Sequence, residues 1–308
     1  MTQTSQTSGT FDTSQILRTL SNQMADAVER ISPALVLVDG RSRQPASGFV
    51  YEQNLILTAS HVLERDDHLT IRTHDGRVLA AQLAGRDAGT DLAVLRVTDA
   101  DIEPAQSAAE EARVGQLVMA VGRTAEGPMA SSGVVSIVNG PLRTERGATI
   151  DRYIRTDAIP YPGFSGGPLI NVEGHVLGLL TTGLVNGIAL ALPYSIARGI
   201  ADILARQGQV KRGYLGISSQ FIDIPATQRV GRSREHGLLL LKVDENSPAH
   251  RGSLLVGDIL IALDGQSLND TGDLHRLLVG ERVGKTVPVE VIRGTALQTL
   301  QVTIEQRR

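Results

Sequence analysis

Hydrophobic and polar positions change their period along this chain of 308 residues, and the changes mark its parts. Residues 1–13 are a polar tract rich in Ser, Thr and Gln, which has too few apolar side chains to fold alone, so we expect it to be disordered. Apolar residues then recur at helical spacing, which predicts one amphipathic helix over residues 14–30. These residues are Leu17, Leu20, Met24, Val28 and Ile31.

Between residues 34 and 192 the pattern changes to short apolar runs that are typical of β-strands. Turn signals such as Asp75-Gly76 and Glu173-Gly174 separate the runs, and no long helices alternate with them. This favours a barrel or sandwich over a doubly wound α/β sheet. The clearest runs are residues 34–38, 55–58, 92–95, 117–121 and 176–180.

A second helix is predicted to begin at Pro193 and to end at Gly208. The short polar segment 209–212 that follows is the expected domain boundary. The remaining stretch, 212–308, is an α/β mixture. We expect strands near 238–243, 259–262 and 287–292 and a helix over 271–278. The sequence therefore predicts one mainly β domain over 14–207 and a second, α/β domain over 212–308.

Composition excludes several functions. The net charge of −3 and an aromatic content of 3% argue against a nucleic-acid partner, and the chain contains no cysteine, which excludes thiol chemistry. No histidine has metal-ligand spacing, so we expect neither a metal nor another cofactor. The sequence shows neither an export signal nor a membrane-spanning run, so we expect a cytoplasmic protein, or one of the periplasm or cell envelope if a signal has been removed.

Three polar residues stand at or near the ends of predicted strands, in the chain order His61, Asp91, Ser165. A serine hydroxyl is too weakly acidic to attack a peptide bond unaided. A histidine can remove its proton, and a carboxylate can orient that histidine and stabilise its charged form. We assign Ser165 as the nucleophile, His61 as the general base and then acid, and Asp91 as the orienting acid. This order, used by chymotrypsin-type proteases, predicts peptide-bond cleavage.

The glycines around Ser165 have a chemical reason of their own. A tetrahedral oxyanion needs backbone N–H donors that converge on one point. We expect the amides of Gly163 and Ser165 to provide them, with Phe164 contributing the intervening peptide. Gly163 permits backbone angles that a side chain would hinder, and Gly166 and Gly167 leave room behind the nucleophile.

These motifs, together with Asp157 eight residues before Ser165 and the downstream domain, resemble the HtrA/Deg serine proteases over about residues 30–306. The resemblance implies a two-barrel trypsin-like domain followed by a C-terminal PDZ domain. It also implies ATP-independent degradation of unfolded or misfolded proteins, as in protein quality control. Phe164 departs from the usual Asn of the family, and the segment 122–125 departs from its usual Gly-Asn-Pro pattern.

By the same resemblance, four residues are candidates for the primary specificity pocket: Ile159, Ile188, Ala189 and Leu190. No acid stands at the position of the pocket floor, so we do not expect selection of Lys or Arg. We expect a loose preference for small or medium aliphatic residues before the cut bond.

In the second domain, residues 212–217 resemble the carboxylate-binding loop of the family's PDZ domains. Backbone amides in such a loop bind a terminal carboxylate, and the strand after it accepts an added peptide strand. The candidate peptide-binding residues are Tyr214, Leu215, Gly216 and Ile217 from the loop and its strand, and Leu274 and Leu278 from the helix. Helical spacing alone leaves open whether the two helix leucines line a pocket or belong to the core. Ser253 stands where the family usually has Gly.

The family's usual assembly implies a homotrimer held by N-terminal aromatic residues, of which only Phe11 is present here. The leading hypothesis is an endopeptidase whose PDZ domain captures peptide C-termini. A peptide-binding or chaperone-like protein with an inert protease domain stays open because of Phe164. A non-proteolytic esterase is disfavoured, because the motif lacks the context and the residue order of α/β-hydrolases.

Overall fold

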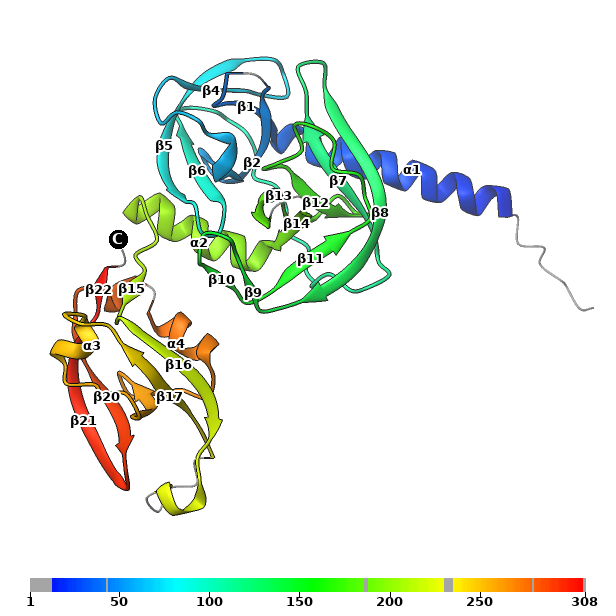
Figure 1. The fold of residues 1–308 in the computed structure, drawn as a ribbon. Helices are drawn as coiled ribbons and strands as arrows, with labels where there is room; N and C mark the ends of the chain where they lie inside the picture. The colour runs from blue at the N-terminus through cyan, green and yellow to red at the C-terminus, as the bar shows by residue number, and fades with distance from the viewer. Residues whose placement is uncertain (1–12, 43, 186–187, 230–234, 279, 307–308) are drawn as a thin grey trace, which may run out of the picture. The chain divides into compact units, whose positions relative to one another are not determined.

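The computed structural model describes residues 13–306 except 43, 186–187, 230–234 and 279 (Figure 1). The chain divides into two compact units, and the division falls between Gly208 and Gln209. Each unit has its own hydrophobic core. The tract 1–13 that we expected to be disordered lies outside the described residues, apart from Thr13, the first residue of a helix.

The first barrel is a closed, antiparallel, six-stranded barrel with the strand order β1-β2-β3-β6-β5-β4. Its interior is filled by aliphatic side chains such as Val38, Ile56 and Leu95. All five residues of β3 are buried, which explains why this strand is a continuous apolar run in the sequence. The strands are β1 (Leu35–Asp39), β2 (Ala46–Glu52), β3 (Leu55–Ala59), β4 (Leu69–Arg72), β5 (Val78–Asp87) and β6 (Leu92–Val97).

The second barrel, also closed and antiparallel, has the strand order β11-β14-β13-β12-β7-β8. Its core includes Val118, Leu169 and Leu180. A separate two-stranded ribbon, β9 (Leu142–Arg143) with β10 (Thr149–Ile150), lies between β8 and β11 in the chain. The barrel strands are β7 (Leu117–Arg123), β8 (Pro128–Asn139), β11 (Tyr153–Thr156), β12 (Pro168–Asn171), β13 (Val176–Val185) and β14 (Ile188–Pro193).

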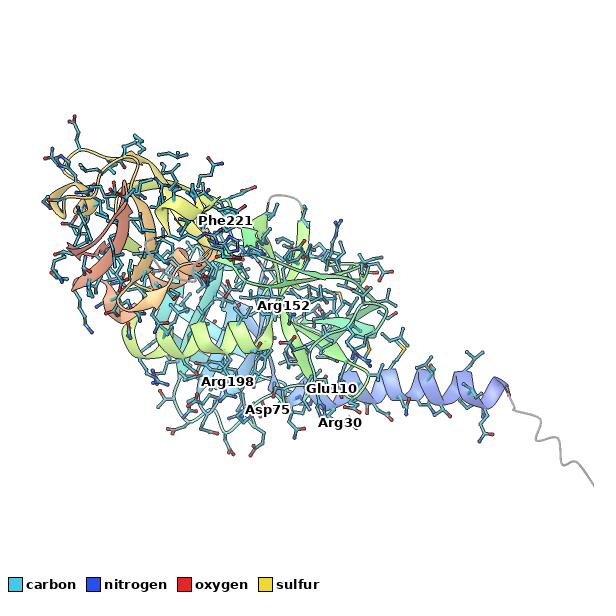
Figure 2. The ribbon with its side chains drawn as sticks, turned by 90° about the horizontal axis from the view of Figure 1, so that it is seen from below. Arg30, Asp75, Glu110, Arg152, Arg198 and Phe221 are labelled. Atoms are coloured by element: carbon cyan, nitrogen blue, oxygen red, sulfur yellow. The ribbon has the colours of Figure 1, made fainter. Side chains whose placement is uncertain are left out.

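Helix α1 (Thr13–Ile31) confirms the predicted N-terminal helix and projects from the barrels in Figure 1. Only its C-terminal part is packed: Ala27 is buried, and the Arg30 guanidinium donates to the carbonyl of Glu173 in the β12–β13 turn (Figure 2). Farther out, Ile16 and Leu17 are 53% and 63% exposed. Within the described residues, no helix is both long and apolar enough to cross a membrane.

Helix α2 (Tyr194–Gln207) confirms the second predicted helix, and Gly208 ends it in the left-handed conformation, with φ of 76°. The helix follows the second barrel in the chain but also packs against β5 and β6 of the first barrel. At its start, the ring of Tyr194 lies 6.2 Å from the ring of Phe49. Helix α2 therefore contacts both barrels.

The second unit is built on one antiparallel sheet with the strand order β16-β17-β18-β20-β21, and β16 lies at its edge. Helix α4 (Thr271–Leu277) confirms the helix expected over 271–278, and α3 (Pro248–Arg251) is a single turn. Ser253 has a φ of 62°, a left-handed conformation that suits glycine, which is why the family's usual Gly fits there. The strands are β15 (Gly213–Tyr214), β16 (Ile217–Asp223), β17 (His236–Val243), β18 (Ile259–Leu263), β19 (Gln266–Ser267), β20 (Thr286–Arg293), β21 (Ala296–Thr303) and β22 (Glu305–Gln306).

Candidate active site

The first barrel supplies a preformed pair of His61 and Asp91. His61 lies in the 3₁₀ turn after β3, and Asp91 lies in the turn before β6. The His61 Nδ1 atom is 2.7 Å from Asp91 Oδ2, and the His61 backbone amide donates to Asp91 Oδ1 at 2.8 Å. Asp91 is 1% exposed, and the hydroxyl of Thr181 also donates to its Oδ2. This arrangement fixes the orientation of the imidazole and leaves Nε2 as the nitrogen available for proton transfer.

The turn that presents Asp91 is itself held by local hydrogen bonds. Asp91 has a φ of 56°, a conformation that Asp tolerates better than most residues. The Asp87 carboxylate at the end of β5 accepts the Thr90 amide at 3.0 Å and the Thr90 hydroxyl at 2.6 Å. The backbone carbonyl of Asp91 accepts the amide of Ser60, next to His61, at 2.9 Å. These contacts couple the turn directly to the histidine.

Gly183, on β13, leaves the space that the His61–Asp91 pair occupies. A Cβ at this position would lie 2.7 Å from the Asp91 carboxyl carbon and 2.7 Å from His61 Nδ1. Any side chain here would displace one partner of the pair. Gly183 and Thr181 were not among the predicted site residues, although the two threonines that end the apolar run of β13 are a signal for a polar site.

The loop that carries Ser165 depends on the glycines around it. Gly163 and Gly166 have φ values of 98° and 87°, which side-chain-bearing residues rarely adopt. A Cβ at Gly166 would collide with the carbonyl of Ser47, and one at Gly167 would collide with the carbonyl of Val121. The space behind Ser165 is therefore filled by backbone from both barrels.

Along this loop, backbone amides that have a hydrogen-bond acceptor alternate with amides that have none among the described residues. The amide of Phe164 donates to the Tyr161 carbonyl at 3.0 Å, and the amide of Gly166 donates to the Leu180 carbonyl at 2.8 Å. The amides of Gly163 and Ser165 have no acceptor among the described residues. They are the two amides that the sequence analysis expected to bind an oxyanion, which stays a prediction.

Ser47, on β2, holds this loop from the first barrel and is fully buried. Its hydroxyl donates to the Gly163 carbonyl at 2.7 Å, and the same hydroxyl oxygen accepts a hydrogen bond from the amide of Arg123 at 2.8 Å. Its backbone amide donates to the Ser165 carbonyl at 3.2 Å. Ser47 was not among the predicted site residues, although a serine within the apolar run of β2 is a signal that could have indicated it.

Phe164, the departure from the family pattern, does not fill the space in front of Ser165. Its side chain is 1% exposed and belongs to the core of the second barrel. The ring meets the ring of Tyr161 edge to face at 5.6 Å, and a Cβ at Gly122 would lie 2.5 Å from it. The bulky side chain is thus accommodated under the loop by the absence of a side chain at Gly122.

The second departure, at residues 122–125, places a buried arginine between the barrels. The Arg123 guanidinium donates to the carbonyls of Thr73 and His74 in the first barrel at 3.2 Å and 3.1 Å. Arg123 is 6% exposed, and burial lowers the pKa of its guanidinium. Arg123, the last residue of β7, therefore ties the turn end of the β7–β8 hairpin to the first barrel.

His61 and Ser165 line the same cavity, which has a volume of about 370 Å³. The Ser165 hydroxyl lies 3.5 Å from the Thr182 hydroxyl, and no hydrogen bond joins it to His61 within the described residues. Hydrogen bonds between catalytic groups are often long before a substrate binds and tighten in the complex. The histidine pair is therefore formed, whereas the contact between serine and histidine is not.

Of the four residues expected to form a specificity pocket, only Ala189 lines this cavity. Ile159 is 56% exposed, Leu190 is buried, and neither they nor Ile188 lie on the cavity wall. No carboxylate lines the cavity in the described part of the chain. Its remaining wall is formed by residues that the sequence analysis did not assign to a pocket, among them Arg41, Gln44, Pro160, Tyr161, Pro162, Leu180 and Thr182.

In the second unit, the expected peptide-binding residues gather where β16 begins. The Tyr214 hydroxyl donates to Asp244 Oδ2 at 3.0 Å, and hydrogen bonds from Lys242 and Tyr214 lower the pKa of that carboxyl. Leu215 is buried, and Gly216 has a φ of 76°. Ile217, the first residue of β16, is half-buried against the core.

Leu274 and Leu278, for which the sequence left core and pocket open, are 5% and 9% exposed. Both belong to the hydrophobic core of the second unit, together with Leu215. Their small exposed fractions limit what either leucine could offer to a bound peptide, although their role in a pocket stays a prediction.

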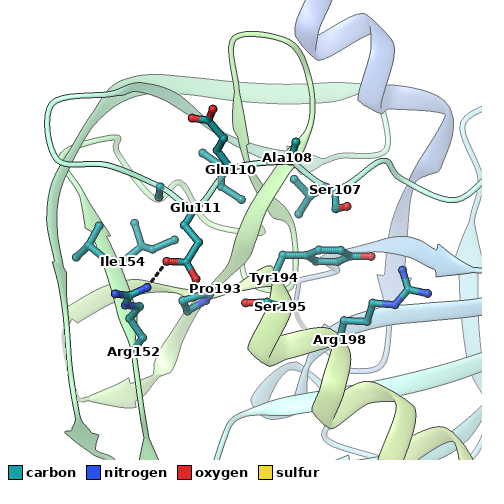
Figure 3. Close-up of a pocket in the computed structure, with 15 residues that line it drawn as sticks. Ser107, Ala108, Glu110, Glu111, Arg152, Ile154, Pro193, Tyr194, Ser195 and Arg198 are labelled. Atoms are coloured by element: carbon teal, nitrogen blue, oxygen red, sulfur yellow. Dashed lines mark hydrogen bonds and ion pairs between the residues drawn. The ribbon is translucent and has the colours of Figure 1, made fainter.

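A second cavity of about 280 Å³ lies in the first unit at the start of α2 and contains none of the three catalytic candidates (Figure 3). Its wall includes Tyr194 and Arg198 from α2 and the ion pair of Glu111 with Arg152. Within the described ranges, no three His, Asp or Glu side chains lie close enough together to share a metal ion.

Two domain families match the chain: the trypsin-like peptidase domain over residues 46–179 and the PDZ domain over residues 213–304. With the two closed barrels, this defines a trypsin-like peptidase domain followed by one PDZ domain and confirms the expected fold class. The similarity extends to full two-domain structures. The HtrA-type protease AlgW with decapeptide has a TM-score of 0.74 at 25% identity, covering 92% of this chain and 99% of that one. The serine endoprotease from Yersinia pestis has a TM-score of 0.72 at 28% identity, covering 93% and 98%.

The chain belongs to the HtrA/Deg family. It is 34% identical over 271 residues to a probable periplasmic serine endoprotease DegP-like of Halomonas elongata, covering 85% of this chain and 56% of the relative. It is also 34% identical over 278 residues to the protein of the same name in Rhizobium meliloti, covering 86% and 54%. The chain thus spans just over half the length of these curated relatives. Their names contradict our expectation of a cytoplasmic protein, because each is called periplasmic; the N-terminal pattern was not a guide to the compartment.

Proposed function

We propose that the protein is a serine endopeptidase that cleaves unfolded or misfolded polypeptides without ATP, as part of protein quality control in the periplasm. The observation that carries the proposal is the cavity in which His61, paired with Asp91 at 2.7 Å, faces the loop of Ser165. Serine endoprotease is also the name given to the relatives and to structural neighbours of the chain.

In the proposed reaction, His61 Nε2 removes the proton of the Ser165 hydroxyl as the oxygen attacks the substrate carbonyl. The amides of Gly163 and Ser165 then donate to the oxyanion, and each such donor is worth about 3 to 4 kcal/mol. His61 returns its proton to the leaving amine, and water releases the acyl group by the same steps in reverse. Asp91 stays ionised and stabilises the imidazolium throughout.

We infer that the residue before the cut bond is small or medium-sized and aliphatic. Ala189 on the cavity wall, the absence of a carboxylate on its described part, and the cation of Arg41 all disfavour Lys and Arg at this position. Cleavage of a peptide library, read by mass spectrometry, tests this preference. A profile dominated by Lys or Arg before the cut bond would refute it.

We also propose that the PDZ domain binds the free C-termini of peptides and that the protein is a homotrimer. The edge position of β16 supports peptide capture, and the exposed apolar residues Ile16 and Leu17 of α1 support assembly. Phe11 lies outside the described residues. Light scattering should give three times the 32.8-kDa mass of the chain, and a monomeric mass would contradict the trimer.

Labelling with a fluorophosphonate, followed by digestion of unfolded casein, tests the main proposal. We expect the wild-type protein to be labelled and to digest casein, and the Ser165→Ala variant to do neither. Absence of both from the wild type would leave peptide binding as the function. Labelling without digestion would favour an esterase.

A further inference from the structure

The start of β16 has backbone donors that point away from the rest of the second unit. The carbonyl of Leu215 accepts the Ala249 amide at 2.9 Å, and the carbonyl of Gly216 accepts the Asp244 amide at 2.8 Å. The C=O and N–H groups of a trans peptide point in opposite directions. The amides of Gly216 and Ile217 therefore point away from these partners, toward the open edge of the sheet.

Gly216 allows this backbone to pass closely over α3. A Cβ at Gly216 would lie 2.8 Å from the hydroxyl of Ser247, the residue that caps α3. Two successive amides at the end of an open strand suit a carboxylate, and the strand itself can pair with an added strand.

The open edge of β16 keeps a regular period of two. The irregularity in its pairing with β17 falls between Ser218 and Ser219, and it arises because Leu241 on β17 has no partner on β16. Ile217, Ser219 and Phe221 pair with Val243, Leu240 and Leu238, which all face the core that includes α4. These three side chains of β16 therefore lie on the same face of the sheet as α4.

Phe221 is exposed on this face and is labelled in Figure 2. Its side chain is 45% exposed, although its cross-strand partner Leu238 is fully buried. One neighbour orients the ring: the imidazole of His236 lies 5.2 Å away at an interplanar angle of 35°. His236 Nδ1 is in turn 2.8 Å from Asp223 Oδ1. The rest of the Phe221 ring is left available for contact.

We propose that Phe221 forms a subsite for an aromatic or large aliphatic side chain at the fifth residue from the C-terminus of a bound peptide. This inference rests on the proposed capture of C-termini by the PDZ domain. A carboxylate at the amides of Gly216 and Ile217 places the last peptide residue opposite Ile217, and an added antiparallel strand then runs along β16. The third residue from the end lies opposite Ser219, and the fifth lies opposite Phe221 with its side chain on the same face.

The chemistry of the subsite follows from its neighbours. A pair of aromatic rings on adjacent strands gains from both burial and ring contact. We therefore expect a peptide with Phe at the fifth position from its end to bind about 5- to 10-fold more tightly than one with Ala there. A Phe at the fourth or sixth position faces the opposite side of the added strand and should bring no such gain.

The test measures peptide binding by fluorescence anisotropy on the full chain with Ser165→Ala, which prevents cleavage. The probes are labelled octapeptides of Ala and Ser that end in Val, with a single Phe placed at the fourth, fifth or sixth position from the end. Phe221→Ala should abolish the gain from the fifth-position Phe and leave the affinity for the all-Ala/Ser peptide unchanged. Leu241→Ala is the matched control, because Leu241 is equally apolar and 50% exposed but lies on β17, away from the edge, and it should keep the gain.

A C-terminal amide version of each peptide separates the two proposals. If free acids bind and amides do not, but the gain is independent of position or survives Phe221→Ala, the subsite is overturned and carboxylate capture stands. If acids and amides bind equally, or if none binds, carboxylate capture fails and the subsite fails with it.

Discussion

The two barrels contribute to the cavity lined by His61 and Ser165 in different ways. The first barrel provides His61 and Asp91 already joined at 2.7 Å, with a buried carboxylate that also accepts the Thr181 hydroxyl. The second barrel provides Ser165 on a glycine-rich loop, with no hydrogen bond to His61 within the described residues. The pair of His61 and Asp91, our proposed base and acid, is thus fixed by the fold, whereas the position of Ser165, the proposed nucleophile, depends on the peptides of one loop and on the contacts that hold them.

The largest expected effect comes from breaking the preformed pair. Asp91→Asn keeps the shape of the side chain but removes its charge and favours the wrong histidine tautomer, so kcat should fall about 10⁴-fold. Kinetics with a fluorogenic peptide measure this. Thermal unfolding of the same variant serves as the control for folding, and a fall in kcat of less than 10-fold in a folded variant would contradict the role of Asp91.

Gly183→Ala disturbs the same pair from the second barrel. Because the added methyl would meet both the Asp91 carboxyl group and His61 Nδ1, the imidazole must shift, and kcat should fall about 10²-fold. Gly199→Ala is the matched control, since a Cβ there meets nothing within 4 Å and the residue lies in α2, so it should leave kcat unchanged. Equal activity of the two variants would show that the pair tolerates displacement.

Ser47→Ala tests the contact by which the first barrel holds the nucleophile loop. Loss of the hydrogen bond to the Gly163 carbonyl, with the Arg123 amide left unpaired, should lower kcat roughly 10-fold while KM changes less than about 2-fold. Such a split identifies Ser47 as a positioning residue for the oxyanion site.

The control for Ser47 is Ser32→Ala, which removes another buried hydroxyl that donates to a backbone carbonyl, that of Val28 at 2.6 Å. Ser32 does not line the cavity, so its loss should lower stability and leave kcat unchanged. Equal kcat values for the two serine variants would refute the positioning role.

The smallest expected effect is on the stability of the first barrel, from a substitution that does not change the cavity of His61 and Ser165. The hydroxyl of Tyr51 is buried and has no hydrogen-bond partner among the described residues, and burial raises its pKa. Removing it in Tyr51→Phe should increase the free energy of unfolding by about 1 kcal/mol and leave kcat unchanged.

The raised pKa of Tyr51 also gives a sign for the pH dependence. Burial keeps the phenol protonated in the folded state at pH values where the unfolded chain ionises it, so the free energy of unfolding does not depend on this group below the unfolded pKa of about 10 and falls as pH rises above it. Urea unfolding between pH 7 and pH 11 should therefore show a steeper alkaline loss for the wild type than for Tyr51→Phe. Identical slopes would contradict the buried environment of the hydroxyl.

Local patterns were sufficient to predict most of the fold and the three catalytic candidates. The helix that ends at Gly208, the strand that precedes His61 and the strand that follows Asp91 are encoded in short stretches of sequence, and the structure confirms these elements. Ser165 stands out in the sequence because the segment around it is unusually rich in glycine. The assignment of catalytic roles to these residues stays a prediction.

Contacts between distant segments could not be predicted in the same way. Ser47 and Gly163 are 116 positions apart, so nothing local indicates that one holds the other. The burial of Phe164 depends on Gly122, more than forty positions earlier, which is why the sequence alone suggested a ring that could disturb the oxyanion site. Leu274 likewise has a spacing that suits both a core and a pocket, and only the packed structure shows its burial.

Helix α2 gives the peptidase unit a definite endpoint for protein engineering. Its last turn lies so close to Gly85 of β5 that a Cβ there would be 2.5 Å from the Leu204 carbonyl oxygen and 2.6 Å from that of Gly208. The Gly208 carbonyl also accepts the amide of Arg86 at 3.2 Å. A shortened chain that ends after Gly208 therefore keeps the contacts between α2 and the first barrel, whereas one that ends at Pro193 would lose them and uncover the ring of Phe49.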